Sequence, residues 1–302
     1  MKEIPEFPYF KPVKLDDREI FNDVLRGYQP QISELTFTNF FIWRKKYRFR
    51  WSLYKHDTVI VLAGKENVCC SFQPFGSHSI EASTEILDYL KNEKKIEHPQ
   101  IIRADNKTAL ALSGNSSLII QPQREHFDYL YNTQDLINLS GRNYHSKRNH
   151  ITRFESMYGS YQYSPLTFSH VNDCLELSDR WCTVHHCDLS LDLCEEWMAI
   201  RDAFFNYDKL KLSGGVILID NRVEAFSFGE QLNKDTVVVH MEKASTEFHG
   251  LYAMINKMTT EREWKNSMFV NREQDLGEQG LRQAKESYLP AGMVEKFRIK
   301  SL

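Results

Sequence analysis

The stretch "SGGVILIDNRVEAFSFGEQLNKDTVVVHMEKAS", residues 213–245, decides the fold. It predicts three antiparallel strands, because runs rich in β-branched and aromatic residues are separated by tight polar turns at 220–222 and 233–235. Helical spacing precedes the strands in 139–159, 168–187 and 192–210. A helix (251–264), a strand (267–271), a further helix after Asp275 and a last strand (294–300) are expected to complete this unit.

The first half of the chain shows the same order of elements. Two stretches with helical spacing, 14–28 and 33–47, precede short β-rich runs at 47–57, 58–67 and 68–76. Helical spacing returns in 79–95, and 101–106 is strand-like. The sequence therefore predicts an α+β fold with helices around antiparallel sheets. We expect two units, 1–125 and 140–302, joined by a connecting segment at 126–139.

Composition places few limits on function. The 302 residues carry a formal net charge of −3, so a polyanion or a membrane surface must be met by a local basic patch. No apolar run approaches the roughly 20 residues of a membrane helix, and the start "MKEIPEFPYF" lacks the apolar region of a signal peptide. The six cysteines show no dense spacing pattern, which predicts reduced thiols and a cytoplasmic protein.

The order of elements in each half resembles that of an N-acyltransferase (GNAT) fold. GNAT enzymes that use acetyl-CoA carry a Q/R-x-x-G-x-G/A loop before a helix, whose bare amides hold the pyrophosphate. The corresponding junction here, "HMEKASTEFHGLYAMINKM", has Gly250 alone. The missing second glycine argues against an ordinary CoA-dependent acetyltransferase.

Two basic runs are candidates for anion binding. In 139–159, Lys147 falls inside the stripe formed by Tyr144, Ile151 and Phe154, so its ammonium must snorkel, pair or meet an anionic ligand. A solvated basic helix explains this run equally well. The second run, "WRKKYRFRW", interleaves basic and aromatic side chains, which suits phosphates and unstacked bases but also a plain helix-to-strand junction.

The stretch "NREQDLGEQGLRQAKESYLP", residues 271–290, holds the candidate reactive group. Asp275 and Glu278 fit a capping box, and Lys285 lies at the edge of the apolar side of the helix that follows. Lys285 is therefore either a snorkelling surface lysine or a cation presented to a substrate. The spacing alone leaves both interpretations open.

Other motifs carry less weight. Cys182, His185, His186 and Cys187 suggest zinc, but their spacing is not that of a structural site, and we expect no metal. His240 and His249 could assist proton transfer, although ordinary sheet-end histidines explain both. The sequence has neither a G-x-S-x-G elbow nor a Walker loop.

Two motifs resemble a known family. "GLRQAKESYLP" (280–290) resembles the closing G-L-x-x-(F/A)-K-x-x-(F/Y)-x-P helix of the C-terminal catalytic domain of phosphatidylglycerol lysyltransferase. Lys147-Arg148-Asn149 resembles the K-x-R-N-x-(I/L) stretch that begins that domain. The stretches "TFTNFFIWRKKY" and "NREQDLG" extend the resemblance over nearly the full length of the chain. The whole chain resembles the soluble proteins that are grouped with that domain.

The resemblance implies a fold and an activity. As in the similar Fem-type peptidyltransferases, two tandem GNAT-like domains are expected. Known members move an aminoacyl group from aminoacyl-tRNA to an amine or hydroxyl acceptor, so no cofactor is needed beyond that donor. The lysyltransferase domain is fed by a membrane-embedded flippase, whereas this chain has no predicted membrane segment, so a phospholipid acceptor is not expected.

The resemblance also implies roles for residues. Lys285 would stabilise developing negative charge, and Asp275 or Glu273 would orient the acceptor or the α-ammonium of the donor. The substrate-binding candidates are Lys147, Arg148, Asn149, Asn271 and Arg272. The candidates for holding tRNA phosphates are Arg44, Lys45, Lys46, Arg48 and Arg142.

Two other functions remain open from the sequence. A GNAT pair that has lost catalysis would be a binding module, and a CoA-using acyltransferase would need an atypical loop. The amino acid, the acceptor and the oligomeric state are not specified by any of these motifs.

Overall fold

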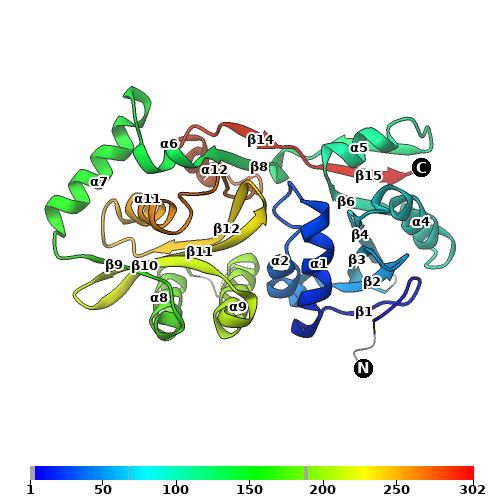
Figure 1. Ribbon diagram of the computed structural model, residues 1–302, viewed down its shortest axis with the longest axis horizontal. Helices are drawn as coiled ribbons and strands as arrows, with labels where there is room; N and C mark the ends of the chain where they lie inside the picture. The colour runs from blue at the N-terminus through cyan, green and yellow to red at the C-terminus, as the bar shows by residue number, and fades with distance from the viewer. Residues whose placement is uncertain (1–3, 67, 187–189) are drawn as a thin grey trace. The chain divides into compact units, whose positions relative to one another are not determined.

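The computed structural model describes residues 4–66, 68–186 and 190–302. The chain forms two compact units, coloured from blue to red along the chain in Figure 1. Unit 1 contains the residues up to Asp128 together with Gln274–Gln279 and Met293–Leu302. Unit 2 contains Tyr129–Glu273 and Gly280–Gly292.

Unit 1 is built around one mixed sheet with the strand order β1-β2-β3-β4-β6-β15-β7, and β5 pairs with β3. Of the strand pairs that the structure describes in this unit, β4–β6 is parallel and the others are antiparallel. The strands are β1 (Lys11–Pro12), β2 (Arg50–Tyr54), β3 (Thr58–Lys65), β4 (Val68–Phe72), β5 (Phe75–Gly76), β6 (Gln100–Ala104), β7 (Leu118–Pro122) and β15 (Phe297–Ser301). The helices are α1 (Arg18–Tyr28), α2 (Phe37–Ile42), α3 (Arg44–Tyr47), α4 (Ser79–Asn92) and α5 (Asn106–Leu112).

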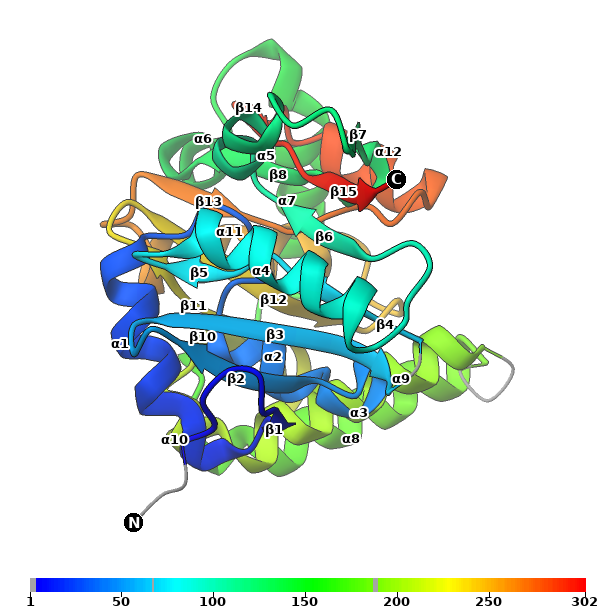
Figure 2. The ribbon, with the colours of Figure 1, turned by 90° about the vertical axis from the view of Figure 1, so that its right-hand side faces the viewer.

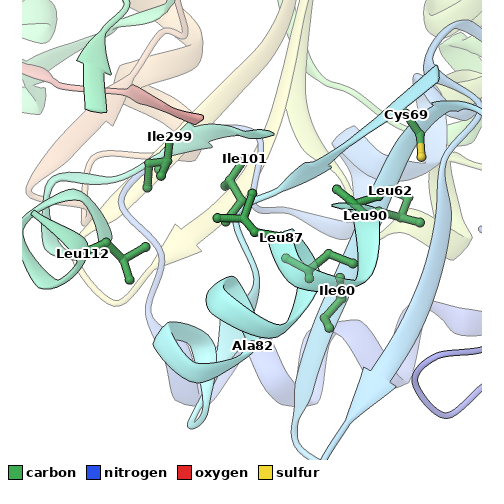
Figure 3. Close-up of a cluster of buried hydrophobic side chains, with 11 residues drawn as sticks. Ile60, Leu62, Cys69, Ala82, Leu87, Leu90, Ile101, Leu112 and Ile299 are labelled. Carbon is green, nitrogen blue, oxygen red and sulfur yellow. The ribbon is translucent and has the colours of Figure 1, made fainter. Parts of the chain in front are cut away.

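The two faces of this sheet bury different side chains. Helix α4 covers one face (Figure 2), where Ile60 and Leu62 of β3 meet Leu87 and Leu90 in an aliphatic cluster (Figure 3). Ring contacts of Phe21 and Phe40 pack α1 and α2 against the opposite face. The period-2 alternation of β3 thus separates an aliphatic core from an aromatic one.

Unit 2 holds the second sheet, in which β8, β13, β12, β11, β10 and β9 are neighbours in that order. The β12–β13 pair is parallel, and the β8–β13, β11–β12, β10–β11 and β9–β10 pairs are antiparallel. The strands are β8 (Asp128–Asn132), β9 (Gln162–Pro165), β10 (Ser213–Ile219), β11 (Arg222–Asn233), β12 (Thr236–Ala244) and β13 (Phe269–Asn271), with β14 (Gly292–Val294) at the boundary of the units. The three strands predicted in 213–245 are thus confirmed as β10, β11 and β12.

Helices cover both faces of the second sheet. Helix α11 lies on one face, and α8 and α9 lie on the other (Figure 1). The helices of this half are α6 (Thr133–Asn138), α7 (His145–Met157), α8 (Val171–Val184), α9 (Leu191–Phe205), α10 (Tyr207–Leu210), α11 (Leu251–Glu263) and α12 (Gln279–Glu286). Short 3₁₀ turns lie at Leu15–Asp17, Arg124–His126, Arg142–Tyr144 and Phe168–His170.

The last strand belongs to a different sheet from the one expected. The sequence "VEKFRIK" was predicted to complete the second unit, but β15 pairs with β6 and β7 of unit 1, where Ile299 is fully buried. Without β15, the facing edges of β6 and β7 would leave their backbone groups unpaired. The segment 126–139, expected to be a connector, contains β8 and α6. The boundaries therefore differ from 1–125 and 140–302, because the chain returns to unit 1 twice.

Two sequence expectations concern the environment of the chain. Across residues 4–66, 68–186 and 190–302, none of the helices is both long and apolar enough to span a membrane. Cys69, Cys70, Cys174 and Cys194 carry free thiols. Cys182 is disulfide-bonded, so the prediction of reduced thiols is wrong there, and Cys187 lies outside the described residues.

Candidate functional site

An open cavity of about 320 Å³ lies in unit 2. Its wall carries the cationic side chains of Lys147, Arg272 and Lys285, which come from α7, from the end of β13 and from α12. Glu242 of β12 is the carboxylate in the same wall. Three separate elements therefore bring three cations to one cavity, and α7 lies far from the other two in the sequence.

Helix α7 places Lys147 as its periodicity predicts. Tyr144, Ile151 and Phe154 are buried, and Lys147 on the same stripe is half-buried. Its Nζ lies 4.0 Å from the centroid of the Tyr288 ring. Partial burial, and then the nearby Arg272 guanidinium, lower the pKa of Lys147 to about 8. The ammonium thus lies against an aromatic face, and Lys147 forms part of the cavity wall.

Arg272 is the most constrained of the three cations. Its Nη2 donates to Glu242 Oε1 over 2.9 Å, and its guanidinium lies 4.9 Å from the Tyr288 ring centroid. The second carboxylate oxygen of Glu242 accepts from Asn256 Nδ2 over 3.1 Å. Both oxygens of Glu242 are therefore engaged by protein donors, and the wall retains a net positive charge.

Lys285 is buried and does not snorkel to the surface. Its Nζ donates to the backbone carbonyl of Arg272 and, over 3.4 Å, to that of Glu273. The hydroxyl of Tyr131 donates over 2.8 Å to the carbonyl of Lys285 itself. The side chain thus fixes its ammonium on two backbone carbonyls just after β13.

The cavity also meets the beginning of α11. Gly250, the residue before this helix, has φ of +91°, and a Cβ there would collide with the carbonyl oxygen of His150. Glycine therefore lets α7 pass directly beside the start of α11. His150 and His249 line the cavity at this crossing, with ring centroids 5.0 Å apart.

A buried histidine supports the strand end that carries Arg272. His240 of β12 lies between Glu230 Oε1 at 2.9 Å from its Nε2 and Glu273 Oε1 at 3.1 Å from its Nδ1. Burial opposes its charge, but the hydrogen bonds to Glu230 and Glu273 prevail and raise the pKa of His240 to about 9. Glu273 therefore contributes a carboxylate to His240 and a carbonyl to Lys285, and it is not among the cavity-lining residues.

Asp275 and Asn271 hold the backbone on either side of Glu273. Asp275 is fully buried in unit 1, where it accepts from Gly277 N over 2.9 Å and from Arg124 Nη1 over 3.2 Å. Leu276 and Gly277 have positive φ, so the chain turns first and α12 begins only at Gln279. Asp275 thus does not cap the helix as expected. Buried Asn271 accepts from Glu273 N over 2.8 Å.

Arg148, Asn149 and Arg142 are not among the residues that line the cavity. Arg148 donates to the carbonyls of Leu139 and, over 2.7 Å, of Gly141, so it holds the segment that precedes the helix. Exposed Asn149 contacts His145 Nε2 over 3.1 Å, and Arg142 is exposed in the turn before α7.

The second basic run forms α3 and the residues beside it in unit 1. Arg44 stacks 3.8 Å from the centroid of Phe41, and Lys46 lies 5.6 Å from the Trp43 ring. Lys45 and Arg48 are exposed. The interleaved basic and aromatic side chains therefore make stacking contacts, and their contact with tRNA stays a prediction.

The zinc candidates form different contacts. His185 Nδ1 lies 2.9 Å from the carbonyl of Trp181, and the two rings stack at 3.8 Å. Among the described residues, no group of three or more histidine, cysteine or acidic side chains could hold a metal ion.

Sequence reasoning missed Glu242, Tyr288 and His150. A signal existed for the first, because His240 and Glu242 alternate along the strand "TVVVHMEKA" and so place two polar side chains on one face. Tyr288 looked like part of an apolar helix face. No local pattern in the sequence indicates that His150 meets His249.

Comparisons with known proteins agree with this architecture. A conserved protein of unknown function from Bacteroides thetaiotaomicron is 30% identical, with a TM-score of 0.90 over 97% of this chain and 99% of that one. L-PGS from Bacillus licheniformis is 14% identical, with a TM-score of 0.69 over 99% and 94%. FemX is 8% identical, with a TM-score of 0.58 over 96% of both chains.

These likenesses confirm the predicted fold, an α+β chain of two tandem GNAT-like domains of the Fem type. None of the curated proteins matches the chain. The family profile "Phosphatidylglycerol lysyltransferase, C-terminal" matches residues 25–300. The chain therefore belongs to the phosphatidylglycerol lysyltransferase C-terminal family.

Proposed function

We propose that this chain transfers an aminoacyl group from an aminoacyl-tRNA to an amine or hydroxyl acceptor. The observation that carries the proposal is the cavity of unit 2, where Lys147, Arg272 and Lys285 converge beside a junction that lacks the second glycine of a CoA loop. Membership of the family supports the same class of reaction.

The reaction asks little of the protein beyond placement and charge stabilisation. The aminoacyl ester is already activated, so an acceptor held at the ester carbonyl attacks it directly. Negative charge then develops on the carbonyl oxygen. Lys285 lies on the cavity wall with its ammonium fixed by the carbonyls of Arg272 and Glu273, and a preorganised cation of this kind stabilises that charge without reorganisation.

Lys147 and Arg272 supply the attraction for the donor. Both lie against the Tyr288 ring, which supports cations without neutralising them. A phosphate of the tRNA acceptor end would complete the charge balance of this wall. Arg148, Asn149, Arg142 and the α3 run would contact other phosphates of the tRNA through the salt-sensitive interactions that phosphates make.

Glu273 and Asp275 are assigned supporting roles in this proposal. Glu273 fixes the strand end through His240, and Asp275 fixes the turn before α12. Asn271 holds the same strand end through the Glu273 amide. These residues position Arg272 and Lys285.

A transfer assay tests the proposal. The full chain is incubated with a mixture of tRNAs charged with radiolabelled amino acids and with candidate amine and hydroxyl acceptors. We expect label to move from tRNA to acceptor, and Lys285→Met to reduce the rate by about 10²–10³-fold, the usual loss for one charge-stabilising donor. Lys209→Met, an exposed lysine on α10, is the matched control and should behave as wild type.

Two results would contradict the proposal. Absence of both transfer and tRNA affinity at low salt would favour a binding module. A rise in melting temperature with acetyl-CoA, together with acyl transfer from it, would favour a CoA-dependent enzyme.

A further inference from the structure

Two histidines line the cavity beside the three cations. His150 comes from α7 and His249 from the residue before Gly250, and their ring planes are tilted by 32° with centroids 5.0 Å apart. The collision that any side chain at Gly250 would make with the His150 carbonyl keeps the two backbones in contact. Packing therefore fixes the imidazoles side by side at the cavity.

The surroundings of His150 disfavour the charged form of its imidazole. Burial, then His249, Lys147 and Arg153, all lower the pKa of His150. Across the cavity lie Glu242, Arg272 and Lys285, and the one carboxylate among them is engaged by Arg272 and Asn256. On its own helix, His150 Nε2 lies 3.5 Å from Ser146 Oγ. An uncharged imidazole in a cavity is the form that can accept a proton.

We propose that His150, assisted by His249, carries the proton of aminoacyl transfer. The inference rests on the proposed function. Attack by the acceptor forms a bond from its nitrogen or oxygen to the ester carbonyl carbon, and the acceptor's proton moves to an imidazole nitrogen of His150. The bond from that carbon to the ribose oxygen then breaks, and the imidazolium returns the same proton to the departing ribose oxygen. Atoms and charge balance without another reactant.

His249 places a second imidazole beside His150. It is exposed, whereas His150 is half-buried, so the imidazolium formed at His150 lies beside a ring in contact with water. A general base of this kind contributes about 10²–10⁴-fold to a rate. The arrangement also explains why Lys147 and His150 occur one turn apart on α7: one meets the donor's anion while the other meets the moving proton.

The test is the pH profile of kcat/KM for transfer. We expect wild type to lose activity as pH falls and His150 becomes protonated, and His150→Gln to be slower by about 10²-fold or more with a flattened acidic limb. His249→Gln should lower kcat with a smaller effect on KM. His145→Gln, on the same helix but outside the cavity wall, should keep both the rate and the profile.

A second variant guards against a folding defect. His150→Ala should keep the unfolding midpoint near that of wild type, and added imidazole should restore part of its rate. Wild-type transfer with an unchanged acidic limb in both glutamine variants, or no rescue by imidazole, would overturn the histidine assignment alone. Absence of transfer by wild type would overturn the proposed function and this assignment with it.

Discussion

The ammonium of Lys147 lies 4.0 Å from the centre of the Tyr288 ring, so α7 and the segment just after α12 meet through a cation and an aromatic face. The ring attracts the ammonium but leaves its charge available to an anion. Since the pKa of Lys147 is lowered to about 8, its charge is largely present at pH 7 and largely lost by pH 9. Affinity for tRNA should therefore weaken between pH 7 and pH 8.5.

Lys147→Met should remove this pH dependence and reduce the slope of log affinity against log salt by about one, as for a lost phosphate contact. Binding titrations at several salt concentrations and two pH values measure both effects. Lys209→Met should retain the wild-type slope and pH dependence. An unaltered slope in Lys147→Met would remove Lys147 from the phosphate contacts.

The crossing of α7 and α11 predicts a strong effect at one glycine. Gly250→Ala would place a Cβ against the His150 carbonyl at a positive φ of +91°, which should cost on the order of 2 kcal/mol or more. Gly280 of α12 has no heavy atom within 4 Å of the corresponding Cβ position. Gly280→Ala should therefore be neutral or stabilising by up to about 1 kcal/mol. Urea unfolding of both variants decides, and equal midpoints would refute the collision.

The sequence predicted those elements of the fold that depend on local residue patterns alone. Alternation and polar turns in 213–245 predicted β10–β12, and helical spacing predicted α7 and α11. The position of β15 could not be read in this way, because strand propensity in "VEKFRIK" specifies neither the sheet nor the partners. Its placement between β6 and β7 depends on a pairing about 200 residues apart in sequence, which only the three-dimensional structure supplies.

Part of the cavity could be predicted from two signals in the sequence. The anomaly of a lysine inside an apolar stripe pointed to Lys147, and the family motif pointed to Lys285. Asp275 was assigned to the site from the family resemblance, but its side chain is fully buried in unit 1. Glu242 and Tyr288 were missed because their contacts with Arg272 come from the three-dimensional structure and from no local pattern in the sequence.

His240 predicts how stability depends on pH in the alkaline range. Its pKa in the folded chain is raised to about 9 from an ordinary value near 6.5, so folding binds a proton more tightly. The stabilisation is fully present below pH 6.5 and is lost as pH rises through about 9. The free energy of unfolding should fall over this window in wild type and stay flatter in His240→Gln. Parallel pH curves for the two proteins would show that His240 is not the group responsible.

A buried lysine in unit 1 predicts the largest loss of stability. Lys296 is fully buried, with its Nζ 2.6 Å from Asp128 Oδ1 and 2.5 Å from Glu34 Oε2. Lys296→Met would remove the ion pair of a buried carboxylate, Asp128, which typically costs about 3–5 kcal/mol. Glu34 keeps Arg103, whose Nε lies 3.0 Å from its Oε1.

Adding Asp128→Asn to Lys296→Met should therefore recover part of the stability, because it removes the charge that lost its partner. Lys65→Met, at an exposed position on β3, serves as the control and should unfold at the wild-type urea concentration. A double variant less stable than Lys296→Met alone would mean that Asp128 stabilises unit 1 chiefly through its hydrogen bonds to the Ser33 amide and hydroxyl, at 2.8 and 2.9 Å, and not through Lys296.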